Sequence, residues 1–182
     1  MRIATLGPEG SNHALIARRY LERHGSTEDE VLLYDAFHEA FEALMAGKVE
    51  LVLQCTAHFS HADCVGRYMH RAYPVDTFIA GSRPLALLSR GEVAAPRSVG
   101  RQPATRFYTD LDGFAEQCDT PTIVAAAEGL LAGRFDAAIC AREVLGQHPE
   151  SLRLVKDLGP AQDVWVLYGT TALPDTSSLV LA

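Results

Sequence analysis

TLGPEGSNHALIA, residues 5–17, places a Gly-rich turn between an apolar strand and a helix. Residues 2–6 predict a short buried strand. The GPEG segment at 7–10 predicts a tight turn, because Gly tolerates positive φ and Pro fixes its own φ. Ser11 or Asn12 is suited to cap the helix that follows. A strand, a tight turn and a helix start therefore follow one another at the beginning of the chain.

Such a turn is a candidate anion site. Backbone N–H groups and the partial positive charge of a helix N-terminus would converge on one spot, which suits a carboxylate or a phosphate. We therefore take Gly10, Ser11 and Asn12 as candidate ligand-binding residues. The alternative is an ordinary strand-to-helix turn that holds no ligand, because short Gly motifs give many false positives.

The composition is that of a globular α/β protein. The 182 residues are 48% hydrophobic and 21% charged, with a formal net charge of -7, which favours one domain or two small lobes. An overall basic surface for nucleic acid is not expected. The sequence shows neither a signal-peptide pattern nor an apolar run of membrane-spanning length. The cysteines at 55, 64, 118 and 140 lack a secreted spacing, so we expect reduced thiols and a cytoplasmic location.

Alternating strands and helices predict parallel sheets. The first part of the chain follows a β-α-β-α-β order, with Asp35 as the expected cap of the second helix. In the second part, GRFDAAIC at 133–140 resembles GKVELVLQC at 47–55, which predicts two similar α/β lobes with a ligand cleft between them. The expected helices are 12–24, 36–46, 110–118, a segment from Thr120 or Thr122 to 131, and 142–145. The expected strands are 2–6, 31–34, 49–53, 78–89 (broken near 81–84), 98–99, 135–140, 152–156 and 163–168.

These patterns carry a family resemblance. The LGPEGS turn, the F…A…GxVE…V run before a loop and a late LGP followed by an apolar strand resemble prephenate dehydratase. The resemblance implies the two-lobed periplasmic-binding-protein type II fold, an α/β architecture of mixed sheets with flanking helices. It implies a single catalytic domain over 1–182, with lobe 1 at about 1–77 plus 160–182 and lobe 2 at about 78–159. We expect no ACT regulatory domain.

Two departures from the family pattern bear on the chemistry. Dehydratases carry a Pro-Ile-Glu-Asn-Ser-like loop where this chain has QCTAH at 54–58, and a Thr-Arg-Phe motif where it has QDVWV at 162–166. The TRF triplet at 105–107 lies too early in the chain to replace that motif. The pattern is more similar to the non-aromatising prephenate decarboxylases of bacilysin biosynthesis, which remove the ring carboxylate and keep the 4-hydroxyl group.

The resemblance implies a site that binds a dicarboxylate. One carboxylate would lie at the first helix N-terminus, while Cys55 and Thr56 follow the third strand. A forked guanidinium suits a second carboxylate, and the candidates Ser82, Arg83 and Arg101 come from the second lobe. For each arginine the alternative is an ordinary surface charge.

Decarboxylation also needs a proton donor. His13, His58 and His61 are candidates because imidazole titrates near neutral pH. His13 is slightly favoured because it lies in the first helical turn, although a helix-surface histidine is an equal alternative. Asp163 takes about the position of the dehydratase threonine, so it is a further catalytic candidate. Trp165 is expected in the core or in the wall of the site.

Two cysteines and two histidines after the third expected strand form a possible metal centre. The residues Cys55, His58, His61 and Cys64 follow one another at steps of three, and they are of the types that bind zinc. Uniform three-residue steps drift around a helix and cannot converge on one ion. We therefore predict no metal and no cofactor.

Three functions remain open from the sequence. The leading prediction is a prephenate decarboxylase of a specialised-metabolite pathway. The second is a divergent dehydratase that gives phenylpyruvate, and the third is a non-catalytic cytoplasmic protein that binds a small molecule. The expected partner is a small-molecule substrate, without nucleic acid or membrane, and a homodimer is left open.

Overall fold

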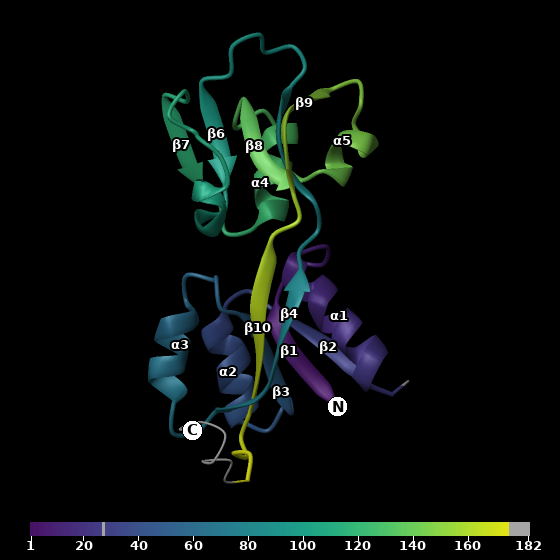
Figure 1. Cartoon of the computed structure of the whole chain (residues 1–182), viewed down its shortest axis with the longest axis vertical. Helices are drawn as coiled ribbons and strands as arrows, with labels where there is room; N and C mark the ends of the chain where they lie inside the picture. The colour runs from purple at the N-terminus through teal and green to yellow at the C-terminus, as the bar shows by residue number, and fades with distance from the viewer. Residues whose placement is uncertain (27, 175–182) are drawn as a thin grey trace. The chain divides into compact units, whose positions relative to one another are not determined.

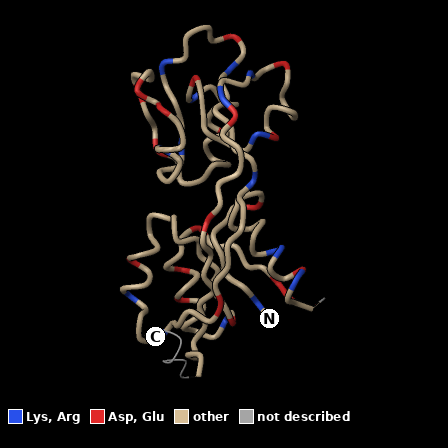
Figure 2. The backbone as a smooth tube through the Cα atoms, in the orientation of Figure 1, with Lys and Arg blue, Asp and Glu red and all other residues tan. Residues whose placement is uncertain are grey.

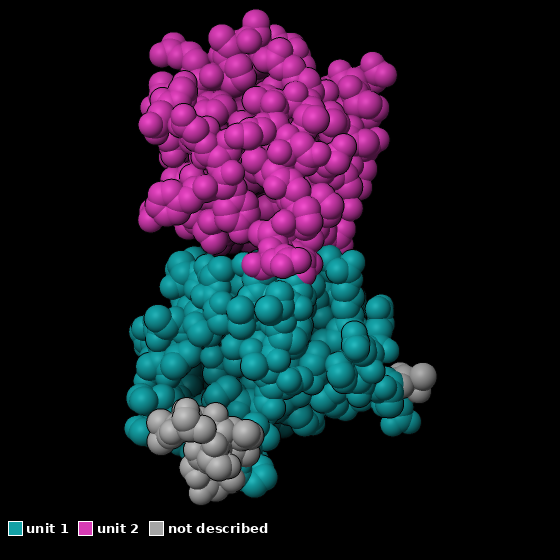
Figure 3. All heavy atoms as spheres, in the orientation of Figure 1, with its two compact units in different colours: residues 1–80, 163–182 teal, residues 81–162 magenta. Residues whose placement is uncertain are grey.

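The computed structural model describes residues 1–26 and 28–174 (Figure 1). The chain forms two compact units, which Figure 3 distinguishes by colour. Unit 1 contains residues 1–80 and 163–182, and unit 2 contains residues 81–162. The chain therefore passes from one unit to the other twice.

Unit 1 is a mixed five-stranded sheet with helices. Its sheet has the order β2-β1-β3-β10-β4. β1 pairs parallel with both β2 and β3, whereas β10 pairs antiparallel with β3. The elements are β1 (Arg2–Leu6), α1 (Asn12–His24), β2 (Glu30–Tyr34), α2 (Phe37–Met45), β3 (Leu51–Cys55), α3 (His61–Tyr68), β4 (Tyr73–Gly81) and β10 (Gln162–Gly169).

Apolar burial on the sheet explains why these segments form. β3 is buried from Val52 to Cys55, and α1 packs Ile16 and Ala17 in the same apolar cluster as its Leu53 and Cys55. α2 buries Phe41 among a second group of apolar residues. Burial of a side chain of this size stabilises the fold by about 1.5–3 kcal/mol. The apolar positions of the helices thus fix which face each one turns to the sheet.

Unit 2 repeats the same topology. Its sheet has the order β7-β6-β8-β5-β9, with β6 parallel to β7 and β8, and β5 antiparallel to β8. The central pair β6 and β8 therefore corresponds to β1 and β3. The elements are β5 (Leu85–Arg90), β6 (Ser98–Arg101), the 3-10 helix η1 (Pro103–Phe107), β7 (Glu116–Asp119), α4 (Ile123–Leu131), β8 (Ala137–Ala141), α5 (Glu143–Gln147) and β9 (Leu152–Gly159).

The sequence echo between the units has a structural basis. Gly47 and Gly133 end α2 and α4 with φ of 67° and 72°, a conformation that glycine adopts without strain. Three residues later, the Glu50 carboxylate accepts a hydrogen bond from the backbone N–H of Arg2. Asp136 accepts one from the N–H of Arg97 at 2.9 Å. In unit 1 the acidic residue precedes β3 and holds the start of β1. In unit 2 the acidic residue precedes β8 and holds the start of β6.

Two local predictions were wrong. The helix expected over 110–118 is absent, because Asp110 accepts a hydrogen bond from the N–H of Asp112 and β7 then pairs with β6. Asp35 does not cap α2, whose N-cap residue is Ala36 and has no side-chain cap bond. Residues 54–73 contain α3, which the sequence pattern did not place. Pairing with a neighbouring strand overrode local helix signals at 110–118.

Charges are interspersed along the described part of the chain. Figure 2 shows Lys and Arg among Asp and Glu in both units. Within residues 1–26 and 28–174, no helix combines the length and the apolar character needed to cross a membrane.

Candidate functional site

The candidate site lies at the carboxyl edge of the unit 1 sheet, between β1 and β3. From β1 the chain passes through α1 to β2, and from β2 it returns through α2 to β3 on the other side of β1. Parallel α/β sheets bind ligands where such connections diverge. The loops 7–11 and 56–60 therefore follow neighbouring strands at this edge. β10 starts at the same edge, because Trp165 pairs with Cys55.

The start of α1 is built as the sequence predicts. Gly10 has φ of 83°, and Ser11 is the N-cap residue. The Ser11 hydroxyl accepts the N–H of Ala14 at 3.1 Å and donates to the carbonyl of Leu6 at 3.1 Å. This hydroxyl is thus used within the protein, and the turn presents backbone N–H groups rather than the Ser11 side chain. Asn12 follows as the first helical residue and is half-buried.

Four aromatic rings from four different elements meet beside this helix start. The ring of His13 lies 5.1 Å from that of Phe37, 5.6 Å from that of His58 and 5.0 Å from that of Trp165, measured between centroids. The rings of Phe37 and His58 are 4.9 Å apart. We call these four residues the aromatic cluster. It brings two imidazoles into a weakly solvated setting.

Burial keeps both imidazoles neutral. Burial and, to a smaller extent, the nearby His58 lower the pKa of His13 to about 3. Burial also lowers the pKa of His58 to about 4, with a smaller effect of His61. Removing a charged group from water disfavours its charged form, which is the physical cause. The lowered pKa values count against His13 and His58 as proton donors near neutral pH, and their catalytic role stays a prediction.

A short hydrogen-bond chain fixes the tautomer of His58. The backbone N–H of Ser60 donates to its Nδ1 at 3.3 Å, and the Ser60 hydroxyl lies 2.8 Å from the same atom. Nδ1 is then an acceptor, which assigns the proton to Nε2. The amide of Gln54 donates to the Ser60 hydroxyl at 3.4 Å. The Nε2–H of His58 is therefore a donor that this hydrogen-bond chain does not use.

Cys55 and Asp163 form the acidic part of the site. Burial and, to a smaller extent, the charge of Asp163 raise the pKa of the Cys55 thiol to about 11. Burial also raises the pKa of Asp163 itself. Thr56 is exposed, and its backbone N–H donates to the carbonyl of Val164 at 2.9 Å. The structure thus holds a protonated thiol next to a carboxyl group that gains protons more readily than usual.

Three buried polar atoms near this edge lack a hydrogen-bond partner within the described residues. They are the Nε2 of His13, the Oε1 of Gln54 and the Nε1 of Trp165. Leaving such a group unpaired costs about 1–3 kcal/mol. Two of the three belong to the aromatic cluster, and they are polar groups that a ligand could satisfy.

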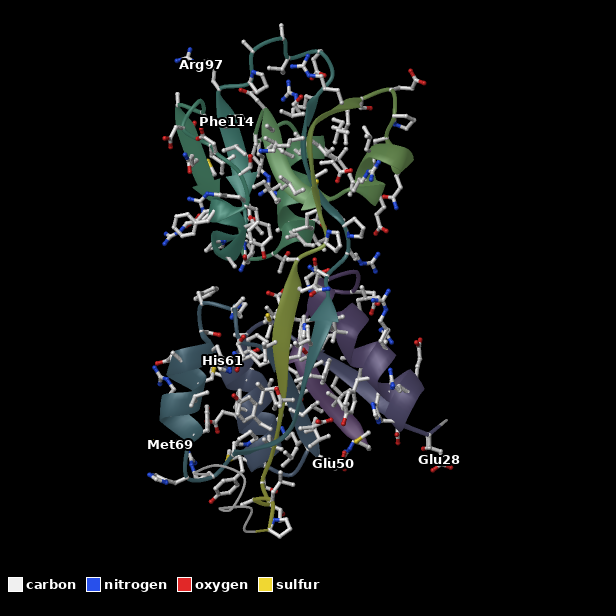
Figure 4. The ribbon with its side chains drawn as sticks, viewed as in Figure 1. Glu28, Glu50, His61, Met69, Arg97 and Phe114 are labelled. Atoms are coloured by element: carbon white, nitrogen blue, oxygen red, sulfur yellow. The ribbon has the colours of Figure 1, made fainter. Side chains whose placement is uncertain are left out.

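The evenly spaced Cys and His residues do not gather. His61 starts α3, where Figure 4 labels it, and its Nε2 lies 2.9 Å from the hydroxyl of Tyr168. Cys64 is buried in the α2 core. Throughout residues 1–26 and 28–174, no group of three or more His, Cys, Asp or Glu is placed to hold a metal ion.

The candidates of unit 2 have partners in that unit. The Ser82 hydroxyl donates to the carbonyl of Arg83 at 2.9 Å and accepts the N–H of Ala161 at 3.0 Å. The guanidinium of Arg83 forms an ion pair with Glu143 at 2.5 Å, and that of Arg101 pairs with Asp119. Ser82 therefore joins the segment between β4 and β5 to the segment between β9 and β10, and both arginines are engaged in ion pairs.

The structure sorts the sequence candidates into two groups. Those of unit 1 lie at one sheet edge, whereas Ser82, Arg83 and Arg101 belong to the other unit. Sequence reasoning missed Phe37, Gln54 and Ser60 as site residues. Phe37 carried only the signal of a core helix position, and Ser60 carried none, since its role depends on a loop that the sequence pattern did not place.

Comparisons with known proteins show the fold. No family model matches the sequence, and no curated protein matches it. Among solved structures, a prephenate dehydratase from Arthrobacter aurescens in complex with L-Phe has a TM-score of 0.67 and 17% identity, covering 96% of this chain and 62% of that one. The chain therefore spans less than two thirds of that relative's length.

Transport-related proteins share the same architecture. An ABC transporter structure from Parabacteroides distasonis has a TM-score of 0.57 and 18% identity, over 93% of this chain and 65% of that one. The aliphatic sulphonate binding protein SsuA from Escherichia coli has a TM-score of 0.51 and 15% identity, over 93% and 64%. The predicted α/β fold of the periplasmic-binding-protein type II class is thus confirmed. Within that class the chain has a prephenate-dehydratase-like fold.

Proposed function

We propose that this protein is an enzyme that binds prephenate and removes its ring carboxylate without making the ring aromatic. The observation that carries the proposal is Asp163. Its carboxyl group has a pKa raised by burial, and the sequence resemblance puts it at about the position of the dehydratase threonine. The similarity to a prephenate dehydratase supports the substrate class, although a fold alone does not fix a function.

Binding would use the start of α1. Its backbone N–H groups suit one carboxylate of the substrate, and the Nε2–H of His58 and the indole N–H of Trp165 are further donors. Phe37 and Trp165 supply apolar faces for a six-membered ring. A buried, weakly solvated carboxylate is also the one that loses CO2 most readily.

The reaction needs one proton and no oxidant. The bond between the ring and its carboxylate breaks, CO2 leaves, and the electron pair passes into the diene. A ring carbon then takes a proton, so that the 4-hydroxyl group stays and the product remains non-aromatic. Asp163 would supply that proton because burial favours its protonated form. It would regain the proton from solvent.

The neutral histidines have a different role in this proposal. They would orient the substrate by hydrogen bonds instead of delivering the proton. A bound carboxylate next to His13 adds a negative charge, which favours the imidazolium form. Substrate binding would then be accompanied by proton uptake.

The dehydratase and the non-catalytic binding protein are the rivals. A binding role is favoured by one observation, namely that SsuA and other ligand-binding proteins share this fold. The cytoplasmic location, the single catalytic domain, the homodimer and the pathway remain predictions.

The test is incubation of the purified, EDTA-treated protein with prephenate, followed by ultraviolet spectra and mass analysis. The expected product has lost CO2, kept its hydroxyl group and shows no aromatic absorption. Phenylpyruvate above the protein-free background would instead establish the dehydratase. No product, together with a rise in melting temperature on adding prephenate, would establish the binding protein. Asp63→Asn, an exposed change in the same unit, is the matched control for Asp163→Asn.

A further inference from the structure

Unit 1 contains a cavity whose lining includes none of the four residues of the aromatic cluster. This cavity has a volume of about 470 Å³ and is formed by α1 and β4, which Figure 1 labels. An α-helix rises about 1.5 Å per residue, so Arg23, which lines the cavity, lies about 15 Å along α1 from His13. The residues that line it are Ile16, Arg19, Tyr20, Arg23, His24, Asp76, Phe78, Ile79 and Ala80.

One wall of the cavity is flat and aromatic. The rings of Tyr20 and Phe78 stack with centroids 5.5 Å apart and an interplanar angle of 21°. The ring of His24 also stacks with that of Tyr20, with centroids 4.7 Å apart and an interplanar angle of 29°. Ile79, which is 71% exposed, adds an apolar side chain at the same cavity. These surfaces suit a planar apolar group.

Asp76 holds this wall in place. Its Oδ2 accepts the hydroxyl of Tyr20 at 2.8 Å, and its Oδ1 accepts the backbone N–H of Thr77 at 2.7 Å. Both carboxylate oxygens are therefore engaged within the protein. Asp76 is a positioning residue for Tyr20, and its charge is partly offset by these donors.

Two arginines supply positive charge. Arg19 and Arg23 lie four residues apart on α1, which places them on the same helix face. Both are exposed, and neither forms an ion pair with any residue in the described ranges. A guanidinium matches a carboxylate through two parallel hydrogen bonds.

We propose that this cavity is a second binding site, which takes an aromatic monocarboxylate. The ring of the ligand would lie against Tyr20 and Phe78, and its carboxylate would lie at Arg19 and Arg23. A cavity of 470 Å³ falls within the range of roughly 300–1,000 Å³ that is usual for small-molecule sites. This site is independent of the proposed decarboxylation.

The test is calorimetric titration of the full chain with 1-naphthoate, with neutral 1-naphthalenemethanol as the matched probe. The variant Arg19→Gln/Arg23→Gln should weaken naphthoate binding about tenfold or more, because two charge-assisted bonds are lost. It should leave the weak binding of the alcohol unchanged. Arg67→Gln/Arg71→Gln makes the same change of charge elsewhere in unit 1 and should behave as wild type.

Nuclear magnetic resonance locates the bound probe. Naphthoate should shift the amide signals of Tyr20, Phe78 and Ile79. Ile79→Glu, which adds a negative charge at an exposed position, should weaken binding without unfolding the chain. Equal naphthoate affinity in wild type and the Arg19/Arg23 variant would overturn the proposal. So would signal shifts confined to His13 and His58, or the absence of any binding.

Discussion

The imidazole of His13 and the indole of Trp165 lie edge to face, with ring centroids 5.0 Å apart and an interplanar angle of 70°. The Nε2 of the first and the Nε1 of the second are both buried and lack a hydrogen-bond partner in the described parts of the chain. A ligand that reached this edge of the sheet could satisfy them. The contact also places the one tryptophan of the sequence in the candidate site.

Tryptophan emission should therefore report binding to this site. Adding prephenate is expected to change the intensity or the wavelength of the Trp165 emission in a saturable way, because its surroundings change when a charged ligand arrives. His13→Leu puts an apolar side chain of similar size in place of the imidazole and so removes its Nε2. It should weaken prephenate binding by about tenfold, the effect of one lost hydrogen bond to a charged group. An unchanged binding curve in this variant would show that prephenate binds elsewhere.

Asp163→Asn should slow the proton transfer to the ring and preserve prephenate binding. Loss of a general acid lowers the turnover rate by about 10²–10⁴-fold. The tryptophan titration should give the same affinity as wild type within about threefold, a difference below 1 kcal/mol. Rates measured by loss of prephenate, with Asp63→Asn alongside, check this prediction. A variant with full activity would remove Asp163 from the proposed reaction.

Stability should decline in mild acid because His13 and His58 are buried in neutral form. An imidazole of the unfolded chain binds a proton near pH 6.5, whereas folded His13 does so only at about pH 3 and His58 at about pH 4. Between those values the unfolded state binds more protons, so the free energy of unfolding falls as the pH decreases. Each such proton contributes at most about 1.4 kcal/mol per pH unit.

Urea unfolding of wild type and His13→Gln over this pH range measures the effect. Glutamine does not titrate, so the variant should lose less stability between pH 7 and pH 5 than the wild type loses. The difference in stability loss between the two proteins reports His13 alone, because both contain the carboxyl groups that titrate at lower pH, including Asp163. Parallel stability curves would mean that His13 is solvated in the folded protein.

Cys55 should react slowly with thiol reagents. Burial and the neighbouring Asp163 raise its pKa to about 11, so the reactive thiolate is rare near neutral pH. Iodoacetamide treatment of the native protein, followed by peptide mass mapping, should modify Cys118 first, since it is the least buried of the four cysteines. Urea-unfolded protein should react at all four. Rapid labelling of Cys55 in the native protein would contradict the buried, protonated thiol.

Asp136→Ala tests the bonds that tie the residue before β8 to the start of β6. The carboxylate accepts the N–H groups of Arg97 and Ser98 at 2.9 and 3.2 Å. Their loss should destabilise the protein by about 1–3 kcal/mol in urea unfolding. Asp157→Ala removes an exposed ion pair with Arg142 and an exposed hydrogen bond from the N–H of Gly159 at 3.2 Å, and it should have an effect of about 0–1 kcal/mol. Similar effects of the two changes would show that the Asp136 bonds add little.

Much of the fold could be predicted from local patterns. The first helix was expected at 12–24 and is found there, because a Ser cap and an apolar face define it within a few residues. The sequence match between 47–55 and 133–140 predicted two similar units. The match begins at Gly47 and Gly133, which both have a positive φ after a helix. The segment 110–118 was predicted wrongly, because its strand forms only by pairing with β6.

The site was predictable only in part, for the same reason. The sequence by itself determined the turn at 7–11, the helix that it starts and the parallel strands on either side, since these depend on neighbours in the chain. The tertiary structure decided that Phe37, His58 and Trp165 surround His13, that the imidazoles are neutral, and that Arg83 and Arg101 are engaged in ion pairs. Contacts, burial and pKa values depend on residues that are distant in the sequence, and only the folded chain brings those residues together.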